Sequence, residues 1–193
     1  MPTQKLYAYV EESGQDTKGR IFVVTVIVSD QNYQQLIALC EAYERASRKG
    51  RRKWHGTDPQ PRLEFMRLVI GDNRFRGALC YAKLQHRVQP DFDAFTVDTL
   101  AGVIASKLDT GHYVVETWID GLSKTKRTEY ANTLRGKGLQ NVHLHRVRKE
   151  ESNALIRLAD SLAGLLRDAI EAKYPAAVQL AQRGQRNSII VEV

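Results

Sequence analysis

The sequence has no apolar run that approaches the roughly 18 residues of a membrane-spanning helix. Charged Lys5, Glu11 and Glu12 also stand where a secretory signal would be apolar. We therefore expect no membrane partner and a cytoplasmic location. Glycine-rich phosphate loops of the nucleotide-binding kinds are absent too, because no Gly-Lys-Ser or Gly-Lys-Thr follows an apolar strand.

Cysteine is scarce. Cys40 falls in a helical pattern and Cys80 in a strand pattern, and neither has a second Cys or a His at metal-ligand spacing. We predict two buried thiols that behave as small apolar side chains, with neither a disulfide nor a zinc site.

The chain contains enough apolar material for one core: of its 193 residues, 42% are hydrophobic and 26% are charged. This length favours a single domain over residues 1–193, with 175–193 as a candidate C-terminal appendage. The formal net charge of +7 and the isoelectric point near 9.5 favour a polyanionic partner, and we expect that partner to be RNA or DNA.

An apolar strand beginning near Lys5 ends on two glutamates and a Ser-Gly turn, and the β-branched run 21–28 follows, which predicts an antiparallel hairpin. Strands and helices then alternate, which predicts an α/β fold with a mixed sheet. The β-prone segment 188–193 is expected to add to a sheet edge or to swap onto a partner, so a homodimer is one expectation. The expected helices cover 30–48, 61–70, 91–107, 125–134, 152–173 and 176–182, and the other expected strands cover 77–84, 113–119 and 141–147.

Three acidic residues share one context: Glu11 ends the first strand, Asp120 ends the fourth, and Asp160 lies in the last long helix. In an open sheet with a crossover connection the first and fourth strands are neighbours, so their ends gather these carboxylates into one crevice. Asp160 lies at the edge of a buried face and needs a partner, since a buried unpaired carboxylate costs on the order of several kcal/mol. Arg157 or Arg167 is one candidate partner, and a divalent cation shared by the three acids is the other.

Glu11 and Glu12 are adjacent in a strand, so their side chains face opposite ways and only one of them enters the core side. A solvated acidic strand end is the alternative to a functional site here. Glu12 is a candidate additional metal-binding acid, and further candidates are Glu64, Asp91, Asp93 and Asp98.

A cationic loop follows the first helix: six of the nine residues from 45 to 53 are basic, and Gly50 interrupts them. Lys and Arg are common at helix C-termini for dipole reasons, so a solvated surface is one interpretation. The other is contact with phosphates together with base stacking, which predicts an affinity that falls steeply with salt. The candidate nucleic-acid-binding residues are Arg48, Lys49, Arg51, Arg52, Lys53 and Trp54.

His143 and His145 point the same way on a predicted strand. We interpret them as a surface pair rather than a metal site, because Arg146, Arg148 and Lys149 nearby disfavour a bound cation.

Three short blocks resemble the signature blocks of the domain of unknown function 3800 family: Tyr-Val-Glu-Glu-Ser-Gly (9–14), Trp-Ile-Asp-Gly (118–121) and Leu-Ala-Asp-Ser-Leu-Ala-Gly (158–164). The resemblance spans nearly the whole chain and implies a ribonuclease H-like fold and a nuclease-related activity. A His after the first helix is usual in that family, and His55 is similar in placement. One departure is that Glu11 stands where the family usually has Asp, which moves the carboxylate outward by about one carbon–carbon bond.

Together with the acidic residues, the resemblance implies a phosphodiesterase that cleaves RNA or DNA with Mg²⁺ or Mn²⁺. Glu11, Asp120 and Asp160 would be the metal ligands, and a metal-bound water would be the nucleophile. His55 would position that water or protonate the leaving oxygen.

Two residues are assigned supporting roles: Ser13 belongs to the first block, and Asn153 shares a polar stripe of the last helix with Asp160. The alternative function is a nucleic-acid-binding or assembly module of the same fold that has lost its metal. In either case a homodimer or a partner protein that completes the site is an expectation to be tested.

Overall fold

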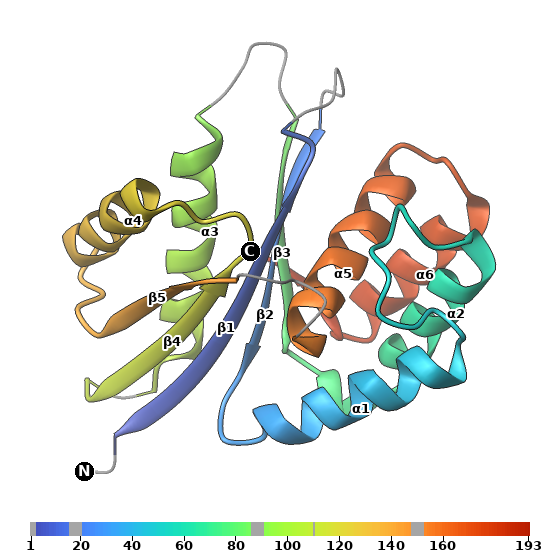
Figure 1. The fold of residues 1–193 in the computed structure, drawn as a ribbon, viewed down its shortest axis with the longest axis horizontal. Helices are drawn as coiled ribbons and strands as arrows, with labels where there is room; N and C mark the ends of the chain where they lie inside the picture. Colours follow the sequence, from blue (N-terminus) through green and yellow to red (C-terminus); the bar gives the residue numbers. More distant parts are fainter. Residues whose placement is uncertain (1–2, 16–20, 86–90, 110, 148–152) are drawn as a thin grey trace.

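The computed structural model describes residues 3–15, 21–85, 91–109, 111–147 and 153–193. Its sheet has six strands in the order β5-β4-β1-β2-β3-β6 (Figure 1). The predicted strand 113–119 is confirmed at both ends, and those at 77–84 and 141–147 are confirmed to within one or two residues. The strands are β1 (Gln4–Ser13), β2 (Ile21–Ser29), β3 (Leu79–Gln85), β4 (Tyr113–Ile119), β5 (Val142–Arg146) and β6 (Ile190–Glu192).

β2 lies between β1 and β3 and is antiparallel to both. Its Val- and Ile-rich sequence is buried on both faces, as expected of a strand inside the sheet. On the other side β1 pairs in parallel with β4, and β4 pairs in parallel with β5. The sheet is therefore mixed, with an antiparallel hairpin at its start, as predicted.

The register between β1 and β4 brings two acidic residues together at one end of the sheet. Val10 is paired with Ile119, and the N–H of Asp120 donates to the carbonyl of Val10 (3.3 Å). Glu11 and Asp120 therefore follow the last pair, at the carboxyl ends of neighbouring parallel strands. The predicted adjacency of the first and fourth strands is confirmed.

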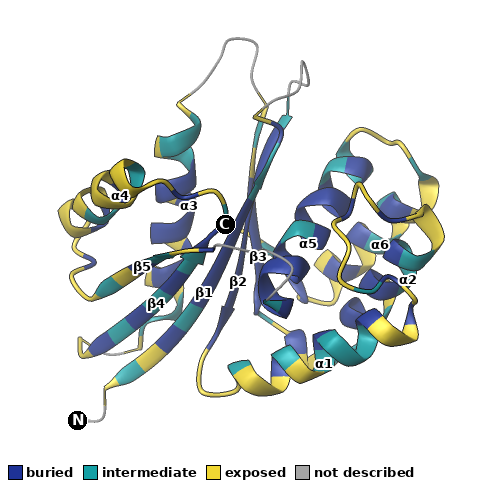
Figure 2. Cartoon of the chain, viewed as in Figure 1, coloured by how far each residue is buried: buried dark blue, intermediate teal, exposed yellow. Residues whose placement is uncertain are grey.

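Within the described ranges, six α-helices and a short 3-10 helix accompany the sheet: α1 (Tyr33–Ala46), α2 (Pro59–Ile70), η1 (Asn73–Phe75), α3 (Phe92–Lys107), α4 (Lys124–Gly136), α5 (Ala154–Ile170) and α6 (Pro175–Arg186). α3 and α4 lie on one face, and α1, α2, α5 and α6 lie on the other (Figure 1). α5 packs directly on β1 and β2, and its Leu- and Ala-rich sequence is buried along most of its length (Figure 2). Each face of the sheet therefore has its own apolar core.

Three helix boundaries, both ends of α1 and the start of α5, differ from the prediction for local reasons. Asp30 does not cap α1, because its carboxylate accepts the N–H of Asn32 (3.0 Å), before the helix begins. α1 ends at Ala46, and Arg48 has a φ of 61°, a left-handed conformation that cannot continue the helix. α5 begins after Asn153, because the side chain of Asn153 accepts the N–H of Leu155 (2.8 Å) as the N-cap.

The C-terminal elements are part of the same fold rather than a separate appendage. α6 packs on α2 and α5, and β6 pairs in parallel with β3 through Ile190 opposite Leu79. Of the two predicted alternatives for the tail, the structure has the one in which it adds to an edge of this chain's own sheet.

Cys40 and Cys80 are buried free thiols, as predicted, and burial raises the pKa of each. None of the helices in the described ranges is long and apolar enough to cross a membrane.

Candidate functional site

The three predicted carboxylates line one cavity of about 670 Å³ at the carboxyl ends of β1 and β4, which we call the acidic cavity. Glu11 comes from β1, Asp120 directly follows β4, and Asp160 projects from α5 on one face of the sheet. Ser13 and His55 line the same cavity, and the side chain of His55 is exposed. Residues from distant parts of the chain thus meet here because the two parallel strands end side by side.

Asp160 is held by the loop that follows α1. One of its carboxylate oxygens accepts the backbone N–H of Trp54 (2.7 Å). Burial raises the pKa of Asp160, and the Trp54 amide opposes that shift because it stabilises the ionised form. Neither predicted arginine is its partner, since Arg157 binds Glu44 and Arg167 binds Glu171.

Asp120 is stabilised at the tight turn after β4. Its carboxylate accepts the N–H of Gly121 (2.9 Å), a residue whose φ of 67° favours glycine. The other carboxylate oxygen lies 3.8 Å from the ammonium of Lys53, whose side chain is 46% exposed. A cation is thus already present beside Asp120, and it is one that can move away.

Glu11 and Glu12 reach the cavity from opposite faces of β1, as the strand geometry predicts. Glu11 is buried on the α5 side, where Thr25 bonds the carbonyls of both Glu11 (3.3 Å) and Ala159 (3.0 Å). Glu12 accepts the hydroxyl of Thr96 on α3 (2.5 Å), and burial raises the pKa of Glu12. Both residues line the cavity because it spans the end of the sheet.

The interpretation of the cationic loop needs two corrections. Trp54 is 1% exposed and its indole N–H donates to Asp168 (2.9 Å), so the ring is not available for base stacking. Lys49 is fully buried, lies 3.8 Å from Glu44 and donates to the carbonyl of Arg52 (2.8 Å), so it does not contact phosphates. The exposed basic residues of the loop are Arg45, Arg48, Arg51, Arg52 and Lys53.

Sequence reasoning missed the residues that fix this loop on α5. The guanidinium of Arg62 on α2 lies 3.2 Å from Asp168, donates to the carbonyl of Trp54 (3.0 Å) and stacks on its ring. Glu44 on α1 forms a two-point ion pair with Arg157 on α5 (2.6 and 2.7 Å). In the sequence, these contacts could have been suspected only from charged residues that fall on otherwise apolar helix faces.

Asn153 is placed outside the cavity. It caps α5, and its side chain also forms a hydrogen bond with Tyr9, which partly offsets the rise of the Tyr9 pKa to about 12 that burial causes. Its predicted supporting role is therefore structural.

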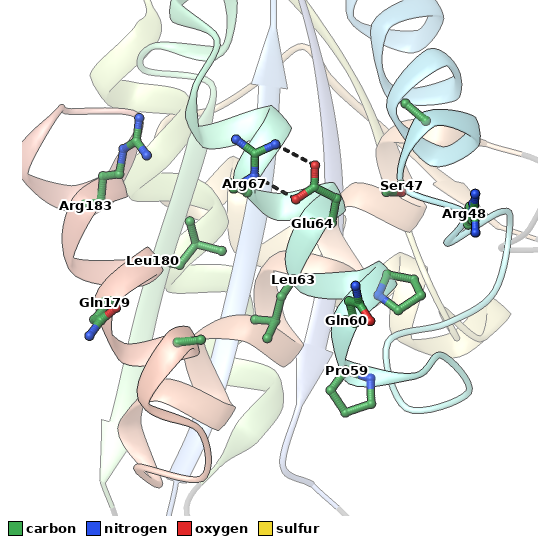
Figure 3. Close-up of a pocket in the computed structure, with 13 residues that line it drawn as sticks. Ser47, Arg48, Pro59, Gln60, Leu63, Glu64, Arg67, Gln179, Leu180 and Arg183 are labelled. Carbon is green, nitrogen blue, oxygen red and sulfur yellow. Dashed lines mark hydrogen bonds and ion pairs between the residues drawn. The ribbon is translucent and has the colours of Figure 1, made fainter.

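A larger cavity, of about 880 Å³, lies between α2 and α6, away from the three carboxylates (Figure 3). Its floor includes Leu63 and Leu180, and its carboxylate, Glu64, is held by Arg67 (2.6 and 2.7 Å). Arg48 lines this cavity and not the acidic one. With its carboxylate already paired to an arginine, this cavity lacks the chemistry of the acidic cavity.

The donor set of the acidic cavity fits a hard divalent cation, since carboxylate oxygens are the ligands that Mg²⁺ and Mn²⁺ prefer. Within the described ranges, no group of three or more His, Cys, Asp or Glu residues is close enough to hold a metal ion in the present arrangement. Lys53 occupies the position of a counter-ion next to Asp120. Binding a metal therefore requires Lys53 to move and the carboxylates to close together.

No protein-family model matches the sequence, and no curated protein matches it. The structure is similar to the crystal structure of the ribonuclease H2 from Pyrococcus horikoshii OT3, with a TM-score of 0.56 over 87% of this chain and 74% of that chain. The fold is ribonuclease H-like. The predicted fold class is thereby confirmed, and at 14% sequence identity the likeness is one of fold alone.

Proposed function

We propose that the protein is a divalent-metal-dependent phosphodiesterase that cleaves RNA or DNA. The observation that supports this most is the convergence of acidic side chains from β1, β4 and α5 in one cavity of a chain whose net charge is +7. Such a cavity attracts a cation, whereas the basic surface around it attracts a polyanion. The ribonuclease H-like fold agrees with this assignment.

Glu11, Asp120 and Asp160 would hold the metal ion. Once bound, it supplies Lewis acidity toward a phosphoryl oxygen and a water of lowered pKa. Lys53 is exposed enough to leave Asp120 and neutralise a phosphate of the substrate. His55 is exposed at the cavity and would donate a proton to the leaving oxygen.

Membership of the domain of unknown function 3800 family is part of this proposal and rests on the three sequence blocks. Glu11 is longer than the Asp usual in that family, and Glu12 brings a further carboxylate from the other face of β1. We propose that this extra reach lets Glu11 extend from its buried position toward a shared metal. We also propose that the protein is cytoplasmic and acts as a homodimer or with a partner protein that completes the site.

One observation favours the alternative, a nucleic-acid-binding or assembly module without a metal. The Lys53 ammonium already lies 3.8 Å from Asp120, so the fold has a built-in cation there. In that case Lys53 would replace the metal, and the cavity would bind a phosphate without cleaving it.

The test is cleavage of end-labelled single- and double-stranded RNA and DNA with Mg²⁺, with Mn²⁺ and with EDTA. We expect metal-dependent cleavage that Asp120→Asn reduces by more than the about 10- to 100-fold that loss of an outer supporting contact costs. Asp98→Asn is the matched control, because Asp98 is an exposed aspartate on α3 that pairs with Lys137. Equal activity of the wild type and Asp120→Asn, or no cleavage with any metal, would reject the proposal.

A further inference from the structure

A ladder of stacked rings crosses β5, β4 and β1 beside the acidic cavity. Trp118 on β4 stacks with His145 on β5 (centroids 5.0 Å apart, planes 24° apart) and with Tyr9 on β1 (5.0 Å, 12°). Tyr7 continues the ladder, 6.3 Å from Trp118 and 3.9 Å from Tyr33 on α1. Neither the fold nor the carboxylate site requires aromatic rings at the β5 end of this series.

The β5 end of the ladder is accessible. α5 lies over β1 and β2, and in Figure 1 the helices of that layer are grouped on the β2 and β3 side, away from β4 and β5. Buried and part-exposed residues alternate along β4 (Figure 2), and Trp118 is one of the part-exposed ones. The side chain of His145 is 43% exposed at the edge of the sheet.

The ladder leads directly to the proposed catalytic carboxylates. Tyr9 and Glu11 are two residues apart in β1 and so project from the same face, and Asp120 follows Trp118 by two residues, directly after the end of β4. The strand advance between them is about 6.6 Å. The ladder thus ends next to the carboxylates, since Tyr9 and Glu11 lie on the same face of β1.

Glu116 sets the orientation of the outermost ring. Its carboxylate bonds His145 (2.6 Å) and His143 (3.2 Å), which holds the His145 imidazole nearly parallel to the Trp118 indole. The Glu116 side chain is 20% exposed and forms hydrogen bonds with both imidazoles. At the other end of the ladder the ammonium of Lys5 lies 5.3 Å from the Tyr7 ring and adds a positive charge.

We propose that this surface binds a single-stranded nucleic acid and leads its backbone into the acidic cavity, with a base stacked on the outer face of His145, the exposed end of the ladder. Stacking on protein rings requires unstacked bases, which a single strand offers and a duplex does not. Ring stacking without base-edge contacts also implies little sequence preference. The inference rests on the proposed function and names its substrate class.

The two tryptophans make the test direct, because Trp54 is 1% exposed and Trp118 is part-exposed. Wild-type protein in EDTA is titrated with a 12-residue oligothymidylate while tryptophan fluorescence is recorded. We expect quenching that Trp118→Leu abolishes. Affinity should fall by about 5- to 150-fold in the surface variant His145→Ala, the range for loss of one stacked base.

Tyr43→Leu is the control, because Tyr43 is a part-exposed tyrosine on α1 outside the ladder, and this variant should bind as the wild type does. Thermal melting verifies that each variant is folded. The inference would be overturned if the oligonucleotide did not bind, or bound without quenching tryptophan fluorescence. It would also be overturned if the protein preferred duplex, or if the folded His145→Ala variant kept wild-type affinity.

Two separate measurements distinguish strand binding at the ladder from metal-dependent hydrolysis in the acidic cavity. Hydrolysis of bis(p-nitrophenyl) phosphate by the wild type with Mn²⁺ reports on the cavity alone, since that diester has no strand to bind. Quenching in EDTA reports on the ladder alone. Quenching without hydrolysis would support strand binding at the ladder and contradict the nuclease function. Hydrolysis without quenching would support the nuclease function and contradict strand binding at the ladder.

Discussion

The indole ring of Trp54 lies directly on Gly164, so closely that a Cβ atom on Gly164 would be 2.2 Å from Cγ of Trp54. One turn earlier in α5, Asp160 accepts the backbone N–H of the same tryptophan. A glycine in a buried helix thus makes room for a ring whose backbone holds a carboxylate of the candidate site. The loop that carries Lys53 and His55 is positioned by this contact.

Substituting Gly164 should therefore destabilise the fold. Gly164→Ala forces the Trp54 ring or α5 to shift, and we expect a loss of about 1–3 kcal/mol in the free energy of unfolding, measured by urea denaturation. Gly102→Ala is the matched control: Gly102 lies within α3 with nothing within 4 Å of the added Cβ, so alanine should stabilise by about 0.4–1 kcal/mol. Equal effects of the two substitutions would contradict the account of the Trp54 contact.

The buried ion pair between Glu44 and Arg157 should matter far more than an exposed one. Glu44→Gln removes the carboxylate charge that the buried Arg157 and Lys49 share, and we expect a loss of about 3–5 kcal/mol. Glu64→Gln, which breaks the exposed pair with Arg67, should cost about 1 kcal/mol or less. The same denaturation experiment compares the two, and a Glu44→Gln loss as small as the control would show that the pair does not anchor the loop.

The raised pKa of Asp160 predicts a particular pH dependence. Burial raises it above the ordinary value of 3.8, so the proton binds more tightly in the folded state. The stabilisation of the fold by this proton is complete below the unfolded-state pKa of Asp160 and is lost as pH rises through its folded-state pKa. In EDTA, the melting temperature of Asp160→Asn minus that of the wild type should therefore increase as pH rises above 3.8.

Asp72→Asn is a control that should show the opposite dependence of stability on pH. Its hydrogen bonds with Arg74 lower the pKa of Asp72 to about 2, so its stabilisation is present above the unfolded-state pKa and is lost as pH falls toward that value. Asp72→Asn should therefore be less stable than the wild type at neutral pH and approach it in acid. A melting difference that changes with pH in the same direction for both variants would show that burial does not govern Asp160.

Affinity for nucleic acid should depend strongly on salt. Arg51, Arg52 and Lys53 are exposed on one loop, and each phosphate contact contributes a slope of about −0.7 to −0.9 to log affinity against log salt. Replacing all three with alanine should flatten the slope by about two to three units. Replacing Lys83, Lys137 and Arg183 removes the same charge elsewhere and should change the slope much less. A wild-type slope in the loop variant would show that the loop is only a solvated surface.

The sequence was sufficient to predict the parts of the fold that depend on local patterns. Strand adjacency followed from the hairpin and the alternation of elements, and it placed Glu11 beside Asp120 at one edge of the sheet. The partner of Asp160 was not predictable in this way, because it is a backbone amide of Trp54 rather than a charged side chain.

The burial of Trp54 and Lys49 was missed for a related reason. A Trp after a run of basic residues is typical of an exposed nucleic-acid contact. Here the ring is buried because Gly164, Arg62 and Asp168, from two other helices, enclose it. Such contacts depend on how α1, α2 and α5 pack, which no window of sequence encodes.

The central claim is that the acidic cavity binds a divalent cation, and titration of the metal-free protein with Mn²⁺ in a calorimeter tests it most directly. We predict a saturable heat for the wild type and for the surface control Asp98→Asn, and its loss in both Asp120→Asn and Asp160→Asn. No heat with the wild type, or the same heat in all four proteins, would contradict the claim and leave the cavity as a metal-free phosphate site.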